Sequence, residues 1–186
     1  MISSSPAGGA HSWRRLKLDR RGLVGVSCPS TRFCIAVDGD GVAHITHHPN
    51  GPLKDWHAIK IDSHHVLGLA CASARLCLAI DNSGSDDSPV LDVVGTTNPS
   101  RSHRWRLLTD QQEVDPINSG AVSCSTTSDC AVIDDDTAIT STSPIGGRHA
   151  WSLSSPDVDL PNGISCAAGG LCVTVDSDGN VSAETG

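Results

Sequence analysis

Aromatic residues are scarce in this sequence: its 186 residues include no Tyr, one Phe and four Trp. No apolar run approaches the roughly 18 residues of a membrane-spanning helix, so no membrane span is expected. Residues 1–12 contain neither the basic region nor the apolar region of a secretory signal peptide. The formal charge of −8 is the opposite of the basic excess typical of nucleic-acid-binding proteins. Nucleic acid is therefore not an expected partner.

Long stretches with helical periodicity are also missing, because Gly and Pro interrupt the sequence throughout. The chain contains 18 Gly and 10 Pro, and Ser and Asp are abundant between short apolar runs. This pattern predicts many short strands joined by turns.

The sequence contains eight Cys, which form four pairs with five residues between the two members. A Trp precedes each pair, by fifteen residues in three copies and by nineteen in the other. An Asp follows each second Cys by four residues, and another follows each Trp by five or six. The chain is therefore an internal repeat of four units. Its markers are Trp13, Trp56, Trp105 and Trp151; Cys28/Cys34, Cys71/Cys77, Cys124/Cys130 and Cys166/Cys172; and Asp38, Asp81, Asp134 and Asp176.

Each unit is predicted to form four short antiparallel strands. In the first unit they cover residues 25–28, 34–38, 42–46 and 56–61, with the hairpin turn DGDG before the third. Repeats of about 40 to 50 residues with four strands are typical of propeller blades. We therefore predict an all-β fold, a four-bladed β-propeller that forms a single domain over residues 1–186.

The order of strands predicts how the ring closes. The chain opens with a Trp strand, which belongs at the outer edge of a blade, and its last unit ends on a third strand. The segment SSSPAGGAHSW at the start matches STSPIGGRHAW at residues 141–151. We therefore expect the strand 13–18 to complete the blade formed by residues 163–186 and to leave no open sheet edge at the closure.

Residues 26–41, VSCPSTRFCIAVDGDG, closely resemble a family of actinobacterial propeller-like repeats with the pattern W-x-x-x-x-x-D … V-S-C-P-S-x-x-F-C-x-A-V-D-x-x-G. The other three copies match this pattern more loosely, and the resemblance covers nearly the whole chain. The resemblance implies the propeller fold and transfers no activity, because these repeats are mostly uncharacterised.

Each Cys pair brackets the first hairpin of its unit, where two Cys can face each other at bridging distance. Four identical disulfides are therefore expected, and they would indicate an extracellular or secreted protein. Reduced core thiols in a cytoplasmic protein are the alternative. Zinc is disfavoured because its sites prefer two residues between paired Cys.

Most of the 21 acidic residues fall in turns and loops that the strand order places on one side of the ring, here called the top face. Such a face should favour cationic ligands or metal ions. Asp in tight turns mostly bonds its own backbone, so many of these carboxylates have a structural interpretation. No cofactor is expected, although clustered carboxylates are the kind of ligand that binds calcium.

The loops entering each unit differ most between copies, so they are the expected site of specificity. The candidate ligand-binding residues are Asp62, His64, His65, Asp19, Asp110 and Glu113. Of these, Asp62, His64 and His65 could also perform general acid–base catalysis, and exposed polar loop residues are the alternative interpretation.

Three hypotheses about function follow. The first is a monomeric binding module that recognises a carbohydrate, a peptide or a small molecule on its acidic top face. The second is a small propeller enzyme, such as a lyase, cyclase or hydrolase, that uses the His and Asp residues above. The third is a purely structural or protein-interaction unit. The sequence contains no diagnostic catalytic motif that would decide between them.

Overall fold

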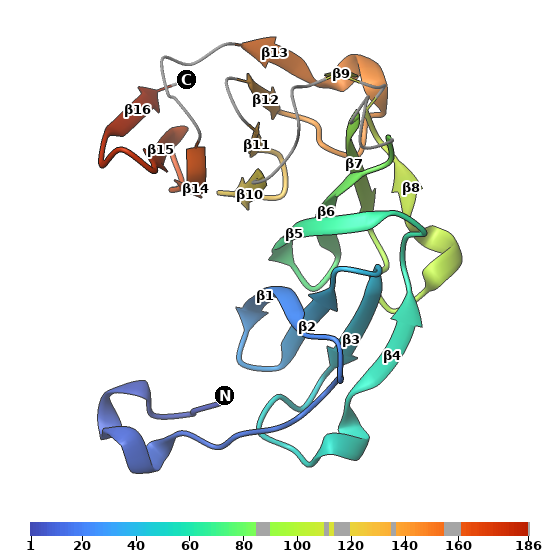
Figure 1. Cartoon of the computed structure of the whole chain (residues 1–186), viewed down its shortest axis with the longest axis vertical. Helices are drawn as coiled ribbons and strands as arrows, with labels where there is room; N and C mark the ends of the chain where they lie inside the picture. The colour runs from blue at the N-terminus through green and yellow to red at the C-terminus, as the bar shows by residue number, and fades with distance from the viewer. Residues whose placement is uncertain (85–89, 110–111, 114–119, 135–136, 155–160, 186) are drawn as a thin grey trace.

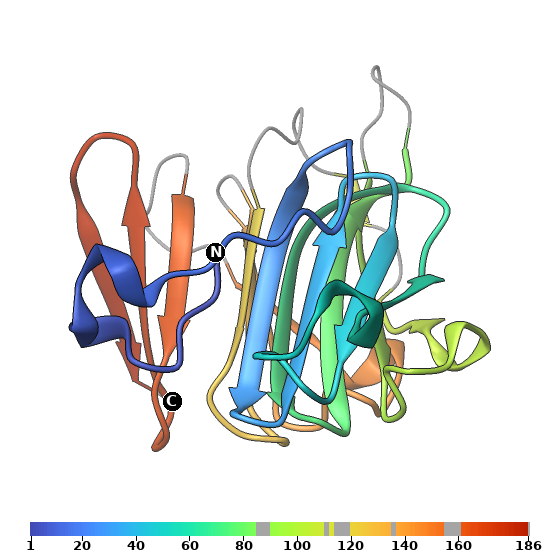
Figure 2. The same ribbon diagram turned by 90° about the horizontal axis from the view of Figure 1, so that it is seen from below.

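The computed structural model describes residues 1–84, 90–109, 112–113, 120–134, 137–154 and 161–185. These residues form an all-β chain of antiparallel sheets that follow one another along an arc (Figure 1). The sheets stand side by side with their strands roughly aligned (Figure 2). The sequence prediction of an all-β fold built from repeated antiparallel sheets is confirmed.

Each sheet corresponds to one sequence unit. The first contains β1 (Leu23–Ser30), β2 (Phe33–Asp38), β3 (Val42–Thr46) and β4 (His57–Lys60). The second contains β5 (His65–Ser73), β6 (Leu76–Asn82), β7 (Val90–Thr96), β8 (Arg106–Leu107) and β9 (Gln112–Glu113). The third contains β10 (Gly120–Cys124), β11 (Cys130–Asp134), β12 (Thr137–Ser141) and β13 (Ser152–Ser154). The fourth contains β14 (Pro161–Cys166), β15 (Leu171–Asp176) and β16 (Val181–Thr185).

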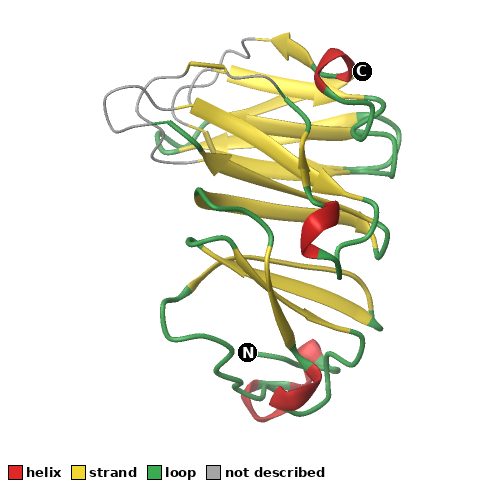
Figure 3. Cartoon of the chain, turned by 90° about the vertical axis from the view of Figure 1, so that its right-hand side faces the viewer, coloured by secondary structure: helices red, strands yellow, loops and turns green. Residues whose placement is uncertain are grey.

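Short 3-10 turns precede the four Trp (Figure 3). They are η2 (Ala10–Ser12), η3 (Leu53–Asp55), η4 (Ser102–Arg104) and η5 (Arg148–Ala150), and η1 (Pro6–Gly8) lies near the N-terminus. In each turn before a Trp, the Trp backbone N–H donates a hydrogen bond to the carbonyl three residues earlier. The turn therefore sets the direction in which each Trp enters its outer strand.

All four predicted disulfides are present and join the first two strands of each sheet. They are Cys28–Cys34, Cys71–Cys77, Cys124–Cys130 and Cys166–Cys172, and the Cα atoms of each pair lie 4.0–4.2 Å apart. Four such bonds indicate a protein that matures in an oxidising, secreted environment.

In three of the four disulfides the second Cys is buried, whereas Cys28 is exposed and Cys172 is half-buried. Cys34 is 5% exposed, Cys77 is fully buried and Cys130 is 4% exposed. Each of these residues lies on the second strand of its sheet, and every described residue of β2 and β11 is buried. Cys77 also belongs to the apolar cluster between the first and second sheets. The second Cys of these pairs is therefore a core residue as well as a covalent link.

Two apolar clusters hold the first three sheets together. Phe33, Ile35 and Trp105 belong to a cluster between the first and second sheets. Leu78 and Val132 belong to a cluster between the second and third sheets. Because each cluster draws residues from two neighbouring sheets, the burial of apolar surface fixes the stacking of the sheets.

The predicted ring closure is wrong for this structure. The fourth sheet has three strands, and residues 13–18 pair with none of them; Arg14 instead forms an isolated bridge with Ile2. Residues 1–22 and the fourth sheet lie at opposite ends of the arc (Figure 1). The Arg14 guanidinium donates to the carbonyls of Asn50 and Gly51 at 2.8 Å, and these contacts hold the N-terminal segment against the first sheet and away from the fourth.

Candidate functional site

The repeated Asp that follows each second Cys is buried at the end of the second strand of its sheet. Asp38 and Asp176 each stabilise a tight turn: the Asp38 carboxylate accepts from the Val42 N–H at 2.8 Å, and Asp176 accepts from the Asn180 N–H at 2.7 Å. The side-chain amide of Asn180 and backbone N–H groups hold the pKa of Asp176 below its ordinary value. The turn-forming interpretation is therefore confirmed for these two residues.

Asp81 occupies the same repeat position in the second sheet but has a different environment. The connection from β6 to β7 is longer here, and Asn82 takes over the turn by accepting from the Gly84 and Val90 N–H groups. Asp81 is fully buried, and neither of its carboxylate oxygens finds a hydrogen-bond donor among the described residues. Burial, the nearby charges of Asp62 and Asp92, and a hydrogen bond that the protonated carboxyl donates to Asp62 raise the pKa of Asp81 to about 8.

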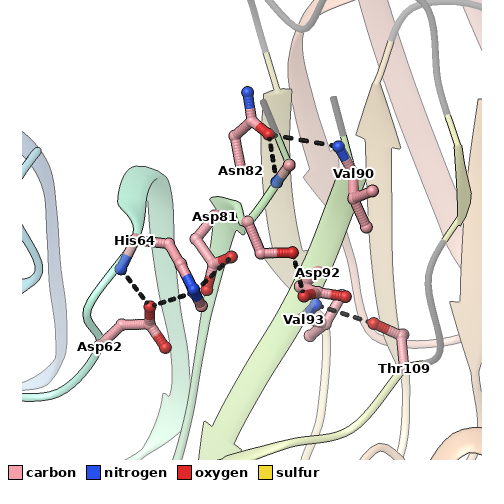
Figure 4. A network of polar contacts seen from close by, with 10 residues as sticks. Asp62, His64, Asp81, Asn82, Val90, Asp92, Val93 and Thr109 are labelled. Atoms are coloured by element: carbon pink, nitrogen blue, oxygen red, sulfur yellow. Dashed lines mark hydrogen bonds and ion pairs between the residues drawn. The ribbon is translucent and has the colours of Figure 1, made fainter. Parts of the chain in front are cut away.

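Asp62 and His64 lie next to Asp81 (Figure 4). The Asp62 carboxylate accepts a 2.7 Å hydrogen bond from the His64 backbone N–H, and the His64 Nδ1 lies 3.0 Å from the same oxygen. The His64 Nδ1 lies 3.9 Å from an Asp81 oxygen. The His64 side chain is 46% exposed, so this cluster opens to solvent through the imidazole.

A small cavity of about 130 Å³ adjoins these residues, with Asp92, Trp105 and Leu107 also in its lining. The Asp92 carboxylate accepts from the Ser83 hydroxyl through one oxygen, and its other oxygen is buried without a donor among the described residues. We call the cavity with Asp62, His64, Asp81 and Asp92 the acidic recess. Three carboxyl groups meet in the recess, and His64 makes the ion pairs with Asp62 and Asp81. Arg106 also lines the cavity, but its guanidinium donates to the Ile145 carbonyl at 2.6 Å and forms no ion pair with a described carboxylate of the recess.

The chemistry of the acidic recess favours a cation. One ligand atom each from Asp62, His64 and Asp81 lie within 4.8 Å of one another, close enough to surround a single ion. An imidazole with two carboxylates suits zinc or manganese better than calcium, whose ligands are oxygen atoms. An ammonium group fits as well: when it binds, Asp81 gives up the proton that its raised pKa of about 8 retains, and the three carboxylates then accept the three N–H donors.

The other predicted site residues are distributed differently. His65 lies beside the first sheet, where a Cβ added to Gly39 would come within 2.9 Å of its ring. Asp19 lies 3.6 Å from the His44 Nε2, and its pKa is lowered chiefly by the Arg21 backbone N–H. Asp110 lies outside the described residues, and Glu113 is placed only through its backbone pairing with Val90. The structure therefore brings together Asp62 and His64, and it places His65 and Asp19 elsewhere.

The paired Cys, the other residues singled out from the sequence, contribute no ligand group to the acidic recess. Cys34 and Cys77 are buried in the core and bonded to Cys28 and Cys71, so neither has a free thiol or a surface that a ligand could reach. A central strand alone does not bury its Cys, because Cys172 on β15 is only half-buried; Cys77 is buried in the apolar cluster between the first and second sheets. Cys34 and Cys77 are therefore structural residues and not part of a binding site.

Sequence reasoning placed Asp81 on the acidic face but did not select it or Asp92 as site residues. The available signal was loop length: the tight DGDG turn of the first unit is replaced by a longer, Ser- and Asp-rich segment after Asp81. A carboxylate without a tight turn to cap is free to face a ligand site. The same comparison of units could have selected Asp81.

A second, larger hollow of about 680 Å³ separates the third and fourth sheets. Small side chains such as Ala131, Ala138 and Ala183, together with Thr140 and Thr174, contribute to its lining. We call it the inter-sheet cleft. It occupies the position that an apolar cluster fills between the other neighbouring sheets.

No protein-family model matches this sequence, and no curated protein matches it. Solved β-propellers match its structure. One is the β-propeller domain of Cps50 (Swd1) from Myceliophteria thermophila, with a TM-score of 0.58 and 14% identity, covering 88% of this chain and 54% of that domain. Another is YCF48 bound to D1 peptide, with a TM-score of 0.59 and 15% identity, covering 95% of this chain and 56% of YCF48.

These matches show that the sheets are arranged as in a β-propeller. The chain spans just over half the length of either propeller, in agreement with its open arc. Within the part of the chain that the structure describes, no helix is long and apolar enough to cross a membrane.

Proposed function

We propose that this chain is a peptide- or protein-binding propeller module, and that its acidic recess receives a lysine side chain of the ligand. The observation that carries the proposal is Asp81, a fully buried carboxylate with no hydrogen-bond donor among the described residues. Ionising this buried group without a donor is unfavourable, which is why its pKa is raised, and a ligand that supplies a positive charge and the donors stabilises the ionised form on binding.

The surroundings of Asp81 support an ammonium group on a flexible stem. Asp62 and Asp92 bring two further carboxylates to the recess, and the cavity of about 130 Å³ is too small for a folded ligand. Trp105 and Leu107 supply apolar surface in the cavity lining, along which the methylene groups of a lysine can lie. Peptide binding is also a function of a similar fold, because YCF48 has been solved with a D1 peptide.

Binding of fluorescent peptides would test the proposal. A lysine-containing peptide should bind at least about tenfold more tightly than the same peptide with acetyl-lysine, because acetylation removes the charge that the recess requires. Asp81→Asn and Asp62→Asn should weaken binding of the lysine peptide, and added salt should weaken this binding further. Asp40→Asn is the matched control: Asp40 is an exposed acid paired with Arg21 at 2.5 Å outside the recess.

Equal binding of the two peptides, or unchanged binding by Asp81→Asn, would contradict the proposal. Zinc or manganese binding that depends on His64, without any peptide binding, would identify the recess as a metal site instead. The enzyme hypothesis for Asp62 and His64 stays a prediction. The 3.0 Å contact between its Nδ1 and an Asp62 oxygen orients the His64 imidazole.

A further inference from the structure

Each apolar cluster between the other neighbouring sheets has a Trp in it or packed against it, whereas the described lining of the inter-sheet cleft contains none. Trp105, from the outer part of the second sheet, is buried between the first and second sheets. Trp151, from the third sheet, packs against the cluster between the second and third sheets. By the same rule, the Trp of the fourth unit should fill the cleft between the third and fourth sheets.

The sequence supplies that residue at Trp13. The segment before it, SSSPAGGAHSW, matches the segment STSPIGGRHAW that ends at Trp151. In the structure Trp13 is 42% exposed. Residues 1–22, which contain it, lie at the opposite end of the arc from the fourth sheet (Figure 1). A large aromatic side chain is therefore exposed, while a cleft of about 680 Å³ lies where its repeat position belongs.

The fourth sheet also lacks the strand that follows this Trp. The first and third sheets have four strands each, whereas β16 is the outer edge of a three-stranded sheet. In the third sheet, Thr140 on β12 pairs with Ser152 on β13. The equivalent residues are Ala183 on β16 and Arg14, so the repeat gives the register in which residues 13–18 would extend the sheet.

The two ends of the arc expose apolar side chains at positions that are buried elsewhere in the repeat. Val26, two residues before its Cys, is 67% exposed, whereas the equivalent Leu69 is 8% exposed. Leu171 at the other end is 39% exposed, whereas the equivalent Leu76 is 4% exposed. Exposed apolar surface at both ends is typical of an interface that is not yet covered.

A hydrogen bond between inner strands recurs at two of the three junctions between neighbouring sheets, and at the other the equivalent residue is Ala70, which has no hydroxyl. The Ser27 hydroxyl accepts from the Cys71 N–H at 3.0 Å, and the Ser123 hydroxyl accepts from the Cys166 N–H at 3.0 Å. Ser165 holds the same position in the fourth sheet, is exposed, and has no hydrogen bond to any described residue through its hydroxyl. The next hydrogen bond of this series would run to the Ser165 hydroxyl from the Cys28 N–H of another first sheet, packed against the fourth sheet.

We propose that two copies of this chain join end to end into one ring, in which residues 13–18 of each copy form the outer strand of the other copy's fourth sheet. Trp13 then enters the partner's inter-sheet cleft, and Cys28 meets the Ser165 of the other copy. The chain's own segment lies at the far end of the arc, and it already follows the outer side of the first sheet, where Arg14 donates to the carbonyls of Asn50 and Gly51 at 2.8 Å.

Each copy has one donor end and one acceptor end, so a two-fold axis covers both ends of each arc at once. This arrangement differs from the monomer expected from the sequence. It does not depend on the acidic recess.

Light scattering on the purified chain would measure the first consequence. The expected mass is about twice the 19.3 kDa of one chain. Trp13→Ala should weaken the dimer at least about 30-fold, as expected for truncation of a buried aromatic anchor. Leu153→Ala, which removes a 57% exposed residue of the third sheet, should leave the dimer unchanged.

Disulfide trapping would decide which chain donates the strand. Arg14→Cys and Ala183→Cys are placed in separate chains, which are then mixed and mildly oxidised. A covalent dimer that needs both variants would support the exchange, and Arg14→Cys mixed with Leu107→Cys should give none. A monomer in light scattering, or a double variant Arg14→Cys/Ala183→Cys that cross-links only within one chain, would overturn the proposal.

Discussion

The second and fourth sheets start from the same repeat but differ in how completely the protein surrounds them. The second sheet has neighbours on both faces, and Leu78 and Ala79 on its central strand are fully buried. The fourth sheet has one neighbour across the inter-sheet cleft, and Val175 on its central strand is 40% exposed. The repeat therefore specifies the strands of each sheet, whereas its position in the arc determines how much of each sheet is buried.

This difference implies a gradient of stability along the arc. A core side chain contributes to the free energy of unfolding in proportion to the apolar surface that it buries. Side chains at equivalent positions of the two sheets should therefore contribute unequally. Proteins open locally where few apolar contacts hold them, and the fourth sheet is the expected region of such opening in the isolated chain.

The largest effect should come from shortening the central residue of the second sheet. Leu78→Ala should lower the free energy of unfolding by about 2–5 kcal/mol, because it leaves a cavity in a fully buried cluster. Val173→Ala, at the equivalent position of the fourth sheet, should cost less than about 1 kcal/mol. Denaturant unfolding, at a concentration where the chain is monomeric, would measure both. Equal losses would show that the fourth sheet is buried as fully as the second.

The sequence predicted much of the fold, because the repeat markers correspond to local structure. The strands predicted for the first unit each overlap one of β1–β4, and all four Cys pairs form the expected disulfides. These features depend on contacts close in sequence, where spacing alone determines which residues face each other. The burial of Cys34 and Cys77 was not part of that prediction, because it depends on the neighbouring sheets rather than on the hairpin.

Ring closure was not predictable in the same way. The matching segments before Trp13 and Trp151 identify residues 13–18 as an outer strand, but they do not specify whose sheet it joins. That depends on how side chains pack between neighbouring sheets, which the spacing of the repeat markers does not specify. Asp81 was missed as a site residue for a related reason: its missing hydrogen-bond donors follow from one longer loop.

A smaller effect is expected from adding side-chain volume at equivalent positions. Ala79 lies in the filled cluster between the first and second sheets, so Ala79→Leu should destabilise the protein by about 1–3 kcal/mol through overpacking. Thr174 lines the inter-sheet cleft, where a Leu of larger volume has room, so Thr174→Leu should change stability by less than about 1 kcal/mol. Thermal unfolding would compare the two, and a loss from Thr174→Leu as large as that from Ala79→Leu would show that the cleft is closed in solution.

The smallest and most specific difference concerns the pH dependence of Asp81 and Asp176. Burial and the charges of Asp62 and Asp92 raise the pKa of Asp81 from 3.8 to about 8. Folding therefore favours its protonated form, so its contribution to stability is greatest at low pH and falls as the pH rises from about 4 to about 8. Hydrogen bonds from Asn180 lower the pKa of Asp176, so its contribution is present above pH 3.8 and is lost as the pH falls through its folded pKa.

Replacing each carboxylate by an amide should therefore change the stability curve in opposite directions. Relative to the unchanged protein, Asp81→Asn should gain stability as the pH rises from 5 to 9, because it removes a carboxylate that is ionised at high pH without a donor. Asp176→Asn should lose stability at neutral pH and match the unchanged protein at strongly acidic pH. His65→Ala, which leaves the acidic recess intact, is the control for Asp81→Asn. Chemical unfolding at several pH values would measure the three variants, and a parallel shift of both Asp variants across the whole range would mean that the two carboxylates share one environment despite their different loops.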